Sequence, residues 1–140
     1  DIIERASKIF DEVVIAVLVN KTKSTLFSVD ERIEMIKEVT KKFKNVSVDS
    51  WSGLLVEYCA NNNISMIVKG LRAVSDFDYE LQMSQINLQL KGIETIFMST
   101  SPVHSFLSSS LVKEIANYGG DVSNYVPAEI LSRLKTRLAR

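Results

Sequence analysis

The stretch Val13-Val14-Ile15-Ala16-Val17-Leu18-Val19 is a continuous apolar run, and a helical pattern opens nearby with Ser28-Val29-Asp30-Glu31. Such a run is typical of a strand that is buried on both faces of a parallel sheet. The Ser-x-x-Glu spacing is that of a capping box, in which the two side chains close the first turn of a helix. The two segments together predict a strand–loop–helix unit, the building block of an α/β fold.

The same alternation continues in both directions along the chain. Strands that alternate with helices imply a parallel sheet with right-handed crossovers, so we expect one α/β domain over residues 1–140. The further strands are expected at 46–48, 66–68 and 94–99, and the further helices at 1–10, 53–62, 76–91, 108–118 and after Pro127.

Composition narrows the class of protein. The 140 residues are 46% hydrophobic and carry 17 basic and 17 acidic side chains, which suits one domain with a real core. A net charge of zero argues against a general nucleic-acid or membrane-surface binder. The single cysteine, Cys59, excludes an internal disulfide, and with the single histidine, His104, it excludes a Cys/His zinc site. No apolar run is long enough to span a bilayer, so we expect a cytoplasmic protein.

Cationic and hydroxyl side chains follow three of the expected strands. Lys21 and Lys23 follow the first strand, Lys69 and Arg72 follow the strand at 66–68, and the serines at 108–110 follow the last. Ligands in open parallel sheets bind beyond the carboxyl ends of the strands. The pattern therefore predicts an anionic ligand at one edge of the sheet.

The triple serine lies between an apolar strand and an amphipathic helix, in the run Phe106-Leu-Ser-Ser-Ser-Leu-Val-Lys-Glu114. A helix start offers unpaired N–H groups and partial positive charge, which suit a phosphate. A simple N-cap is the alternative, because serine is favoured there in any case. The sequence has no Gly-x-x-x-x-Gly-Lys-Ser/Thr, Gly-x-Gly-x-x-Gly or Gly-x-Ser-x-Gly motif, which argues against kinases, dehydrogenases and serine hydrolases. Cations, hydroxyls and helix amides instead fit phosphoryl or nucleotidyl transfer.

Two long motifs carry a family resemblance. Lys69-Gly-Leu-Arg-Ala-Val-Ser-Asp-Phe-Asp-Tyr-Glu80 and Ser105-Phe-Leu-Ser-Ser-Ser-Leu-Val-Lys-Glu114 closely resemble bacterial phosphopantetheine adenylyltransferases, and residues 1–10, 53–56 and 120–122 do so as well. The resemblance implies a Rossmann-like parallel sheet flanked by helices, with a C-terminal helix. It implies transfer of AMP from ATP to 4′-phosphopantetheine, giving dephospho-coenzyme A and pyrophosphate, by direct in-line attack without a covalent intermediate. Magnesium is implied as a companion of ATP.

The resemblance also implies roles for individual residues. Lys23 and Arg72 are the implied catalytic cations, and no protein metal ligands are implied. Lysine at 69 is a departure, because many relatives carry arginine there. The implied residues for the phosphopantetheine substrate are Lys23, Leu54, Leu55, Lys69 and Asn87, and those for ATP are Gly70, Leu71, Arg72, Glu80, His104, Ser105, Phe106, Leu107, Ser108, Ser109 and Ser110.

Family members begin with a strand, a Gly-x-Phe-Asp-Pro turn and a Thr-x-Gly-His segment, and Asp1 corresponds to a position just after that histidine. We therefore expect an N-terminal strand and the principal catalytic histidine to belong to a segment upstream of Asp1. Without them, activity of the 140-residue chain alone is in doubt.

Two alternatives stay open. One is a sibling nucleotidyltransferase with another acceptor, such as nicotinate mononucleotide or glycerol phosphate, although residues 53–56 argue against it. The other is an inactive nucleotide-binding or assembly module of the same fold. The helix at 76–91 has two apolar stripes, which predicts a neighbouring subunit. The resemblance implies a homohexamer, with coenzyme A or dephospho-coenzyme A as product or regulator.

Overall fold

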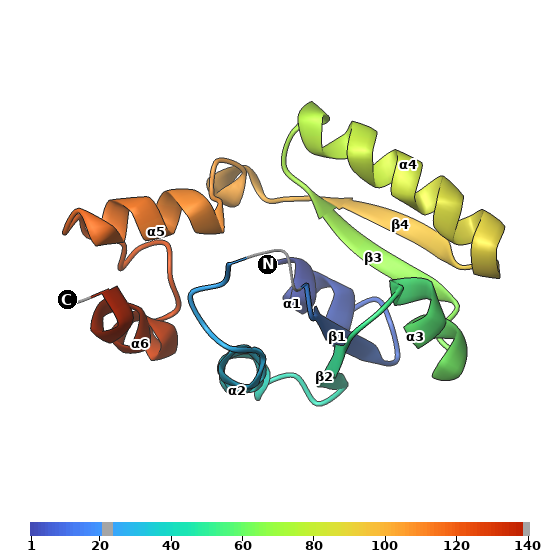
Figure 1. Ribbon diagram of the computed structural model, residues 1–140, viewed down its shortest axis with the longest axis horizontal. Helices are drawn as coiled ribbons and strands as arrows, with labels where there is room; N and C mark the ends of the chain where they lie inside the picture. Colours follow the sequence, from blue (N-terminus) through green and yellow to red (C-terminus); the bar gives the residue numbers. More distant parts are fainter. Residues whose placement is uncertain (21–23, 139–140) are drawn as a thin grey trace.

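Strands and helices alternate from residue 2 to residue 99, and helices follow them, in a computed structural model that describes residues 1–20 and 24–138 (Figure 1). This confirms the α/β class, and the capping box is formed as predicted, with the Ser28 hydroxyl and the Glu31 carboxylate both in place. The elements are α1 (Ile2–Ser7), β1 (Val13–Leu18), α2 (Val29–Thr40), β2 (Val46–Trp51), α3 (Leu55–Asn61), β3 (Met66–Leu71), α4 (Val74–Lys91), β4 (Glu94–Ser99), the 3₁₀ turn η1 (Pro102–His104), α5 (Ser109–Asn117) and α6 (Ala128–Leu138).

The strands form parallel pairs rather than one continuous sheet. β1 pairs with β2 from Val13 opposite Val46, and β3 pairs with β4 from Met66 opposite Glu94. Within the described residues each sheet has two strands, so no ladder joins β1 to β3. Instead, both strands line a cavity of about 860 Å³ that also receives side chains from α1 and α3. The sequence predicts one parallel sheet, whereas the described residues form two parallel strand pairs.

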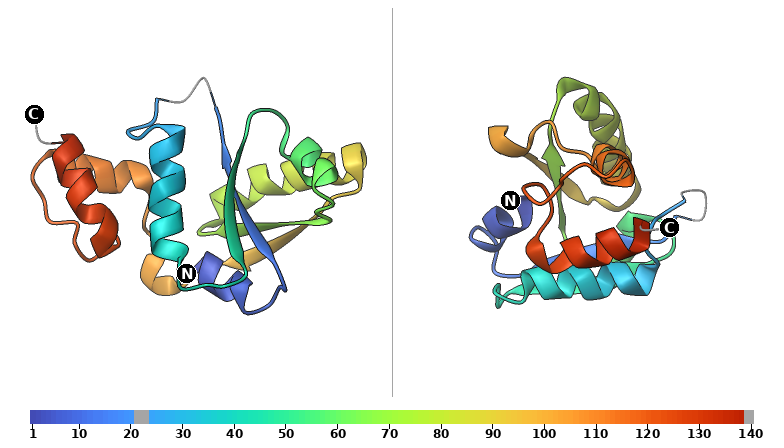
Figure 2. Two further views of the ribbon diagram at one scale, coloured as in Figure 1. Left: turned by 90° about the horizontal axis from the view of Figure 1, so that it is seen from below. Right: turned by 90° about the vertical axis from the view of Figure 1, so that its left-hand side faces the viewer.

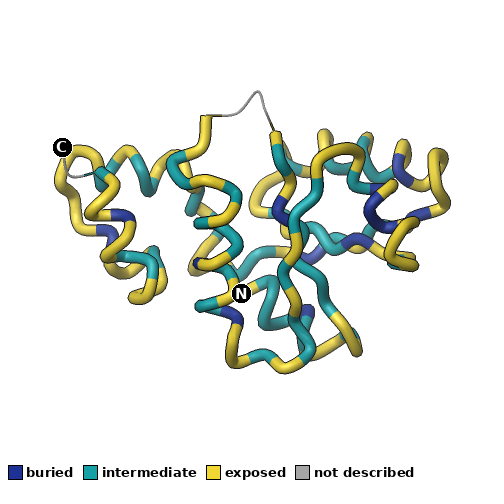
Figure 3. The backbone as a smooth tube through the Cα atoms, turned by 60° about the horizontal axis from the view of Figure 1, so that its bottom comes forward, coloured by how far each residue is buried: buried dark blue, intermediate teal, exposed yellow. Residues whose placement is uncertain are grey.

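The core is divided between the strand pairs and the helices that cover them (Figure 3). One buried cluster consists of Val56 and Cys59 on α3, Ile67 on β3, and Ile93 before β4. At the other side of the molecule α6 lies along α2 (Figure 2), where Leu134 is buried. Packing of amphipathic helix faces on the strands accounts for most of the stability that such helices have.

β3 is longer than the sequence suggests, and this changes the setting of three proposed site residues. Lys69, Gly70 and Leu71 are strand residues paired with β4, whereas the sequence placed them in a loop after residue 68. Gly70 packs tightly, since a Cβ built there would lie 3.0 Å from Cγ1 of Ile2 on α1 and the Ile2 side chain would have to shift. The glycine therefore lets α1 approach the strand closely.

α4 presents large apolar side chains on its surface. Val74 is 81% exposed, Tyr79 64% and Leu90 54%, and Ile86 and Leu88 are also exposed. Part of the two-stripe pattern is thus not covered by the rest of the described chain, whereas Leu81 and Met83 are half-buried. Among residues 1–20 and 24–138, no helix combines the length and apolar character needed to cross a membrane.

Candidate nucleotide site

The cation that follows β3 meets the serine-rich turn directly. Arg72 Nη1 donates a hydrogen bond of 2.7 Å to the carbonyl oxygen of Leu107, which precedes Ser108. Two of the three loops that the sequence assigned to one edge of the sheet are therefore in contact. Lys23, the cation of the third loop, lies outside the described residues.

Asp76, in the first turn of α4, holds the other side of the Arg72 guanidinium. Its Oδ2 accepts from Arg72 Nε at 3.1 Å and from the Arg72 backbone N–H at 3.3 Å, and its Oδ1 accepts from Nη2 at 3.3 Å. Hydrogen bonding by the Arg72 side chain holds the pKa of Asp76 below its usual value. Sequence reasoning missed Asp76, although the four-residue spacing from Arg72 is a recognisable signal for an ion pair.

The serine turn combines both roles that the sequence left open. The Ser108 hydroxyl accepts from the backbone N–H of Leu111 at 3.1 Å, so Ser108 is the N-cap of α5. Ser109 and Ser110 are the first two residues of that helix, and both are exposed. Their backbone N–H groups belong to the first turn, which has no intrahelical acceptors. The cap interpretation is confirmed for Ser108, and the anion option remains at its two neighbours.

The loop between β4 and α5 carries the other residues assigned to ATP. His104 ends η1 and is exposed, and the Ser105 hydroxyl donates to the Pro102 carbonyl at 3.0 Å. The Phe106 ring meets the Tyr125 ring edge-on, with centroids 5.8 Å apart. This loop therefore offers an exposed imidazole and an aromatic pair beside the helix start.

The same loop is also tied to α1 at its beginning. Arg5 Nη1 donates to the Ser99 carbonyl at 2.7 Å, and the Ser101 N–H donates to Asp1 Oδ2 at 3.3 Å. Arg5 and Asp1 are themselves paired at 3.2 Å. Sequence analysis did not assign these two residues any role, and no local pattern reveals a contact across more than ninety positions.

Residues that the resemblance assigns to different substrates lie side by side. Lys69 Nζ on β3 is 3.4 Å from Glu80 Oε2 on α4. Asn87, further along α4, is buried at 7% exposure. Leu55 at the start of α3 lines the large cavity together with Lys69, whereas Leu54 is 56% exposed.

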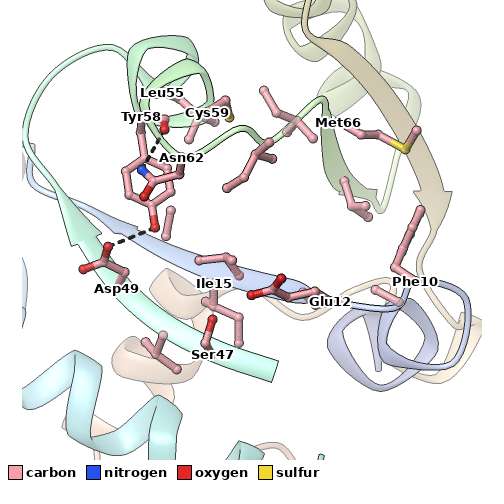
Figure 4. Close-up of a pocket in the computed structure, with 18 of the residues that line it drawn as sticks. Phe10, Glu12, Ile15, Ser47, Asp49, Leu55, Tyr58, Cys59, Asn62 and Met66 are labelled. Carbon is pink, nitrogen blue, oxygen red and sulfur yellow. Dashed lines mark hydrogen bonds between the residues drawn. The ribbon is translucent and has the colours of Figure 1, made fainter. Parts of the chain in front are cut away.

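The cavity beside Leu55 contains a polar cluster that sequence analysis did not find (Figure 4). The Tyr58 hydroxyl donates to Asp49 Oδ2 at 2.9 Å, and Asn62 Nδ2 donates to the Tyr58 carbonyl at 2.9 Å. Burial, with the Asp49 carboxylate as a second cause, raises the pKa of Tyr58 to about 12. The Tyr58–Asp49 bond joins α3 to β2 and thereby fixes the helix that carries Leu55.

Protein ligands for a metal ion are not gathered anywhere in the described residues. No group of three or more His, Cys, Asp or Glu side chains there is placed to hold a cation. Magnesium keeps much of its hydration and is commonly held by few carboxylates together with substrate phosphates.

Comparisons with known proteins identify relatives of this chain. Residues 1–115 match the Cytidylyltransferase-like family. A phosphopantetheine adenylyltransferase of Frankia casuarinae is 60% identical over 100% of this chain and 89% of its own length. The proteins of that name from Streptomyces coelicolor and Thermobifida fusca are 56% and 55% identical over 99% of the chain, and 87% and 85% of their own lengths are covered. The chain therefore belongs to the phosphopantetheine adenylyltransferase family of nucleotidyltransferases, within the cytidylyltransferase-like group.

Proposed function

We propose that the protein transfers AMP from ATP to 4′-phosphopantetheine, forming dephospho-coenzyme A and pyrophosphate in coenzyme A biosynthesis. The observation that carries the proposal is the contact between Arg72 and the Leu107 carbonyl. It places a fixed cation beside the N-terminus of α5, where backbone N–H groups and partial positive charge favour phosphate oxygens. Family membership supplies the identity of the two substrates.

The proposed reaction requires no covalent bond between the protein and a substrate. The nucleophile is the phosphate of phosphopantetheine, which is already an anion and needs no general base. An in-line attack on the α-phosphate of ATP then needs alignment and neutralisation of charge rather than a covalent intermediate. Arg72 and the N–H groups of Ser109 and Ser110 are suited to bind the oxygens of ATP, and Lys23 is proposed to reach the attacking phosphate.

The remaining site residues divide between the two substrates. On the acceptor side we assign Leu54, Leu55, Lys69 and Asn87, of which Leu55 on α3 and Lys69 on β3 line the cavity. On the ATP side we assign the end of β3, Glu80 and the loop before α5, which comprise Gly70, Leu71, Glu80, His104, Ser105, Phe106, Leu107 and Ser108. Magnesium is proposed to arrive as part of the ATP complex, and coenzyme A or its dephospho form to compete as a product.

The cavity between β1 and β3 is proposed to hold one more β-strand. Among the residues that the structure describes, each of these strands has one partner strand, and strand edges that face a cavity need partners for their N–H and C=O groups. By resemblance, the strand belongs to the segment that bears Thr-x-Gly-His, whose histidine would stabilise the transition state. Hydrogen exchange tests this directly: a chain extended by that segment should protect the β1 and β3 amides more strongly than residues 1–140 do.

Calorimetry and a product assay test the function. ATP and 4′-phosphopantetheine should each bind, and the extended chain should form dephospho-coenzyme A. Binding of ATP without turnover in the extended chain would favour an inactive nucleotide-binding module instead. Absence of phosphopantetheine binding would favour a sibling enzyme with another acceptor.

Assembly into a homohexamer is also proposed. The support is the exposed apolar surface of α4, where Val74, Tyr79 and Leu90 are more than half exposed. Apolar patches of this kind are typical of subunit contacts. Sedimentation of the extended chain should give a mass six times that of the monomer, and a monomeric mass would contradict the assignment.

A further inference from the structure

We propose that Asp76 is a positioning residue for ATP binding, because it holds the Arg72 guanidinium in the orientation that faces the serine turn. The inference rests on the proposed function, in which Arg72 binds the phosphates of ATP. It assigns a role to a carboxylate that lies within the motif at residues 69–80 but that the site assignment does not include.

Asp76 and the Leu107 carbonyl hold the Arg72 guanidinium from two sides. Both carboxylate oxygens of Asp76 accept from the guanidinium, through Nε at 3.1 Å and Nη2 at 3.3 Å. Nη1 on the opposite side donates to the Leu107 carbonyl at 2.7 Å. A guanidinium held at both ends cannot rotate about its stem, so its plane is defined before any ligand binds.

The donors that remain fit a phosphate. Arginine has five N–H groups, and Asp76 and Leu107 together use three of them. The other two have no partner in the part of the chain that the structure describes. Two N–H groups on one rigid plane match the oxygens of a phosphate better than a lysine ammonium does.

Stability alone does not explain the pair. The side chains of Arg72 and Asp76 are 39% and 29% exposed, and ion pairs of such exposure contribute little to folding. The ion pair contributes more to ATP binding than to folding, because an arginine that is already ordered loses less side-chain entropy when it binds ATP. An unpaired carboxylate at this place would repel phosphate, so pairing with Arg72 also removes that penalty.

The matched control lies on the same helix. Asp78 is two residues further along α4, is exposed, and has no hydrogen bond or ion pair within the described residues. Asp78→Asn removes the same charge from the same helix terminus. It therefore separates the general electrostatic effect of a helix-terminal carboxylate from the specific hold on Arg72.

The experiment compares Asp76→Asn, Asp76→Ala and Asp78→Asn in the extended, active chain. For both Asp76 variants we expect the KM and the calorimetric Kd for ATP to rise about tenfold or more, with the KM for phosphopantetheine within about twofold of wild type. The Arg72 Nε–H resonance should shift and broaden in these variants, because its acceptor is lost or weakened. Asp78→Asn should resemble wild type in all four measurements.

Several outcomes would overturn the inference. Equal effects of Asp76→Asn and Asp78→Asn on ATP affinity would assign the result to helix charge. Equal rises in the KM of both substrates, together with a lower Tm, would assign it to folding. The failure of the proposed function is distinguishable: a chain that binds ATP but makes no dephospho-coenzyme A still tests Asp76 by calorimetry, whereas one that binds no ATP overturns both.

Discussion

Lys69 Nζ and Glu80 Oε2 lie 3.4 Å apart, and this ion pair joins β3 to α4. Their side chains are 35% and 24% exposed, so solvent screens the pair only in part. The family resemblance assigns these two residues to different substrates. Their contact means that the acceptor and nucleotide sides of the proposed site share one electrostatic network.

Removal of the Lys69 side chain should lower kcat/KM for phosphopantetheine more than kcat/KM for ATP. In Lys69→Ala, Glu80 loses its partner and becomes an uncompensated negative charge beside anionic substrates. We expect kcat/KM for phosphopantetheine to fall about tenfold or more, whereas Lys69→Arg should retain most of it, because the charge is kept. Steady-state kinetics measures both, with Lys44→Ala, an exposed cation in the loop before β2, as the control. If restoring neutrality with Lys69→Ala/Glu80→Gln gives no recovery, the coupling is absent.

Arg137, in the last turn of α6, should matter for stability. Its Nη1 donates to the Leu26 carbonyl at 3.0 Å, its guanidinium lies 5.1 Å from the centroid of the Phe27 ring, and it pairs with Glu31. Thermal unfolding should give a Tm about 2–4 °C lower for Arg137→Ala than for Arg133→Ala. Arg133 is the matched control, since it docks α6 on α2 through carboxylates alone, at 3.4 and 3.5 Å. Equal Tm values for the two variants would show that Arg137 contributes no more to stability than Arg133 does.

Substitutions at Ser108 should separate capping from anion binding. Ser108→Ala removes the cap of α5 and should lower the free energy of unfolding by about 1 kcal/mol. Ser108→Asp retains a capping acceptor, so stability should stay near wild type, but the added charge should weaken ATP binding measured by calorimetry. Ser28→Asp makes the same change at the cap of α2 and should leave ATP affinity unchanged. Unaltered ATP affinity in Ser108→Asp would place the phosphates elsewhere.

Tyr58 should make stability depend on pH at the alkaline end. Its pKa is raised from 10.0 to about 12 in the folded protein, so folding favours the protonated phenol. The stabilisation is fully present below pH 10 and is lost as the pH rises from 10 towards 12, because the unfolded state then releases the proton first. Urea unfolding from pH 8 to 12 should therefore show a steeper loss of stability for wild type than for Tyr58→Phe, and parallel curves would contradict the raised pKa of Tyr58.

Local patterns predict most of the elements. β4 runs from Glu94 to Ser99 and α2 starts after Ser28, both as the sequence indicates, since apolar runs and capping spacings act over a few residues. The errors occur where pairing overrides local polarity: β3 continues through Lys69 and Gly70 because β4 supplies the hydrogen-bond partners. The sequence places these residues in a loop because lysine and glycine are poor indicators of strand.

In the candidate site, too, the sequence predicts features that depend on local spacing and misses contacts that depend on packing. The motifs identify Arg72, Lys69, Glu80 and the serines as residues of interest, but not their partners. The ion pair of Asp76 with Arg72 can be predicted from their four-residue spacing. The hydrogen bonds of Arg5 and Asp1 to the backbone of the loop after β4 cannot be predicted in this way. Contacts at such sequence separations depend on how helices dock on the strands.

Sequence by itself determined the alternation of strands and helices, the capping box at Ser28 and the family, because each is encoded in short-range spacing and residue type. Only the tertiary structure decided that Arg72 meets Leu107 across 35 positions, that Arg137 meets Leu26 across 111, and that β1 and β3 remain unpaired with each other. The physical reason is that hydrogen bonds and ion pairs form between atoms that lie close in space. Proximity between distant residues exists only after the apolar faces of the elements have packed.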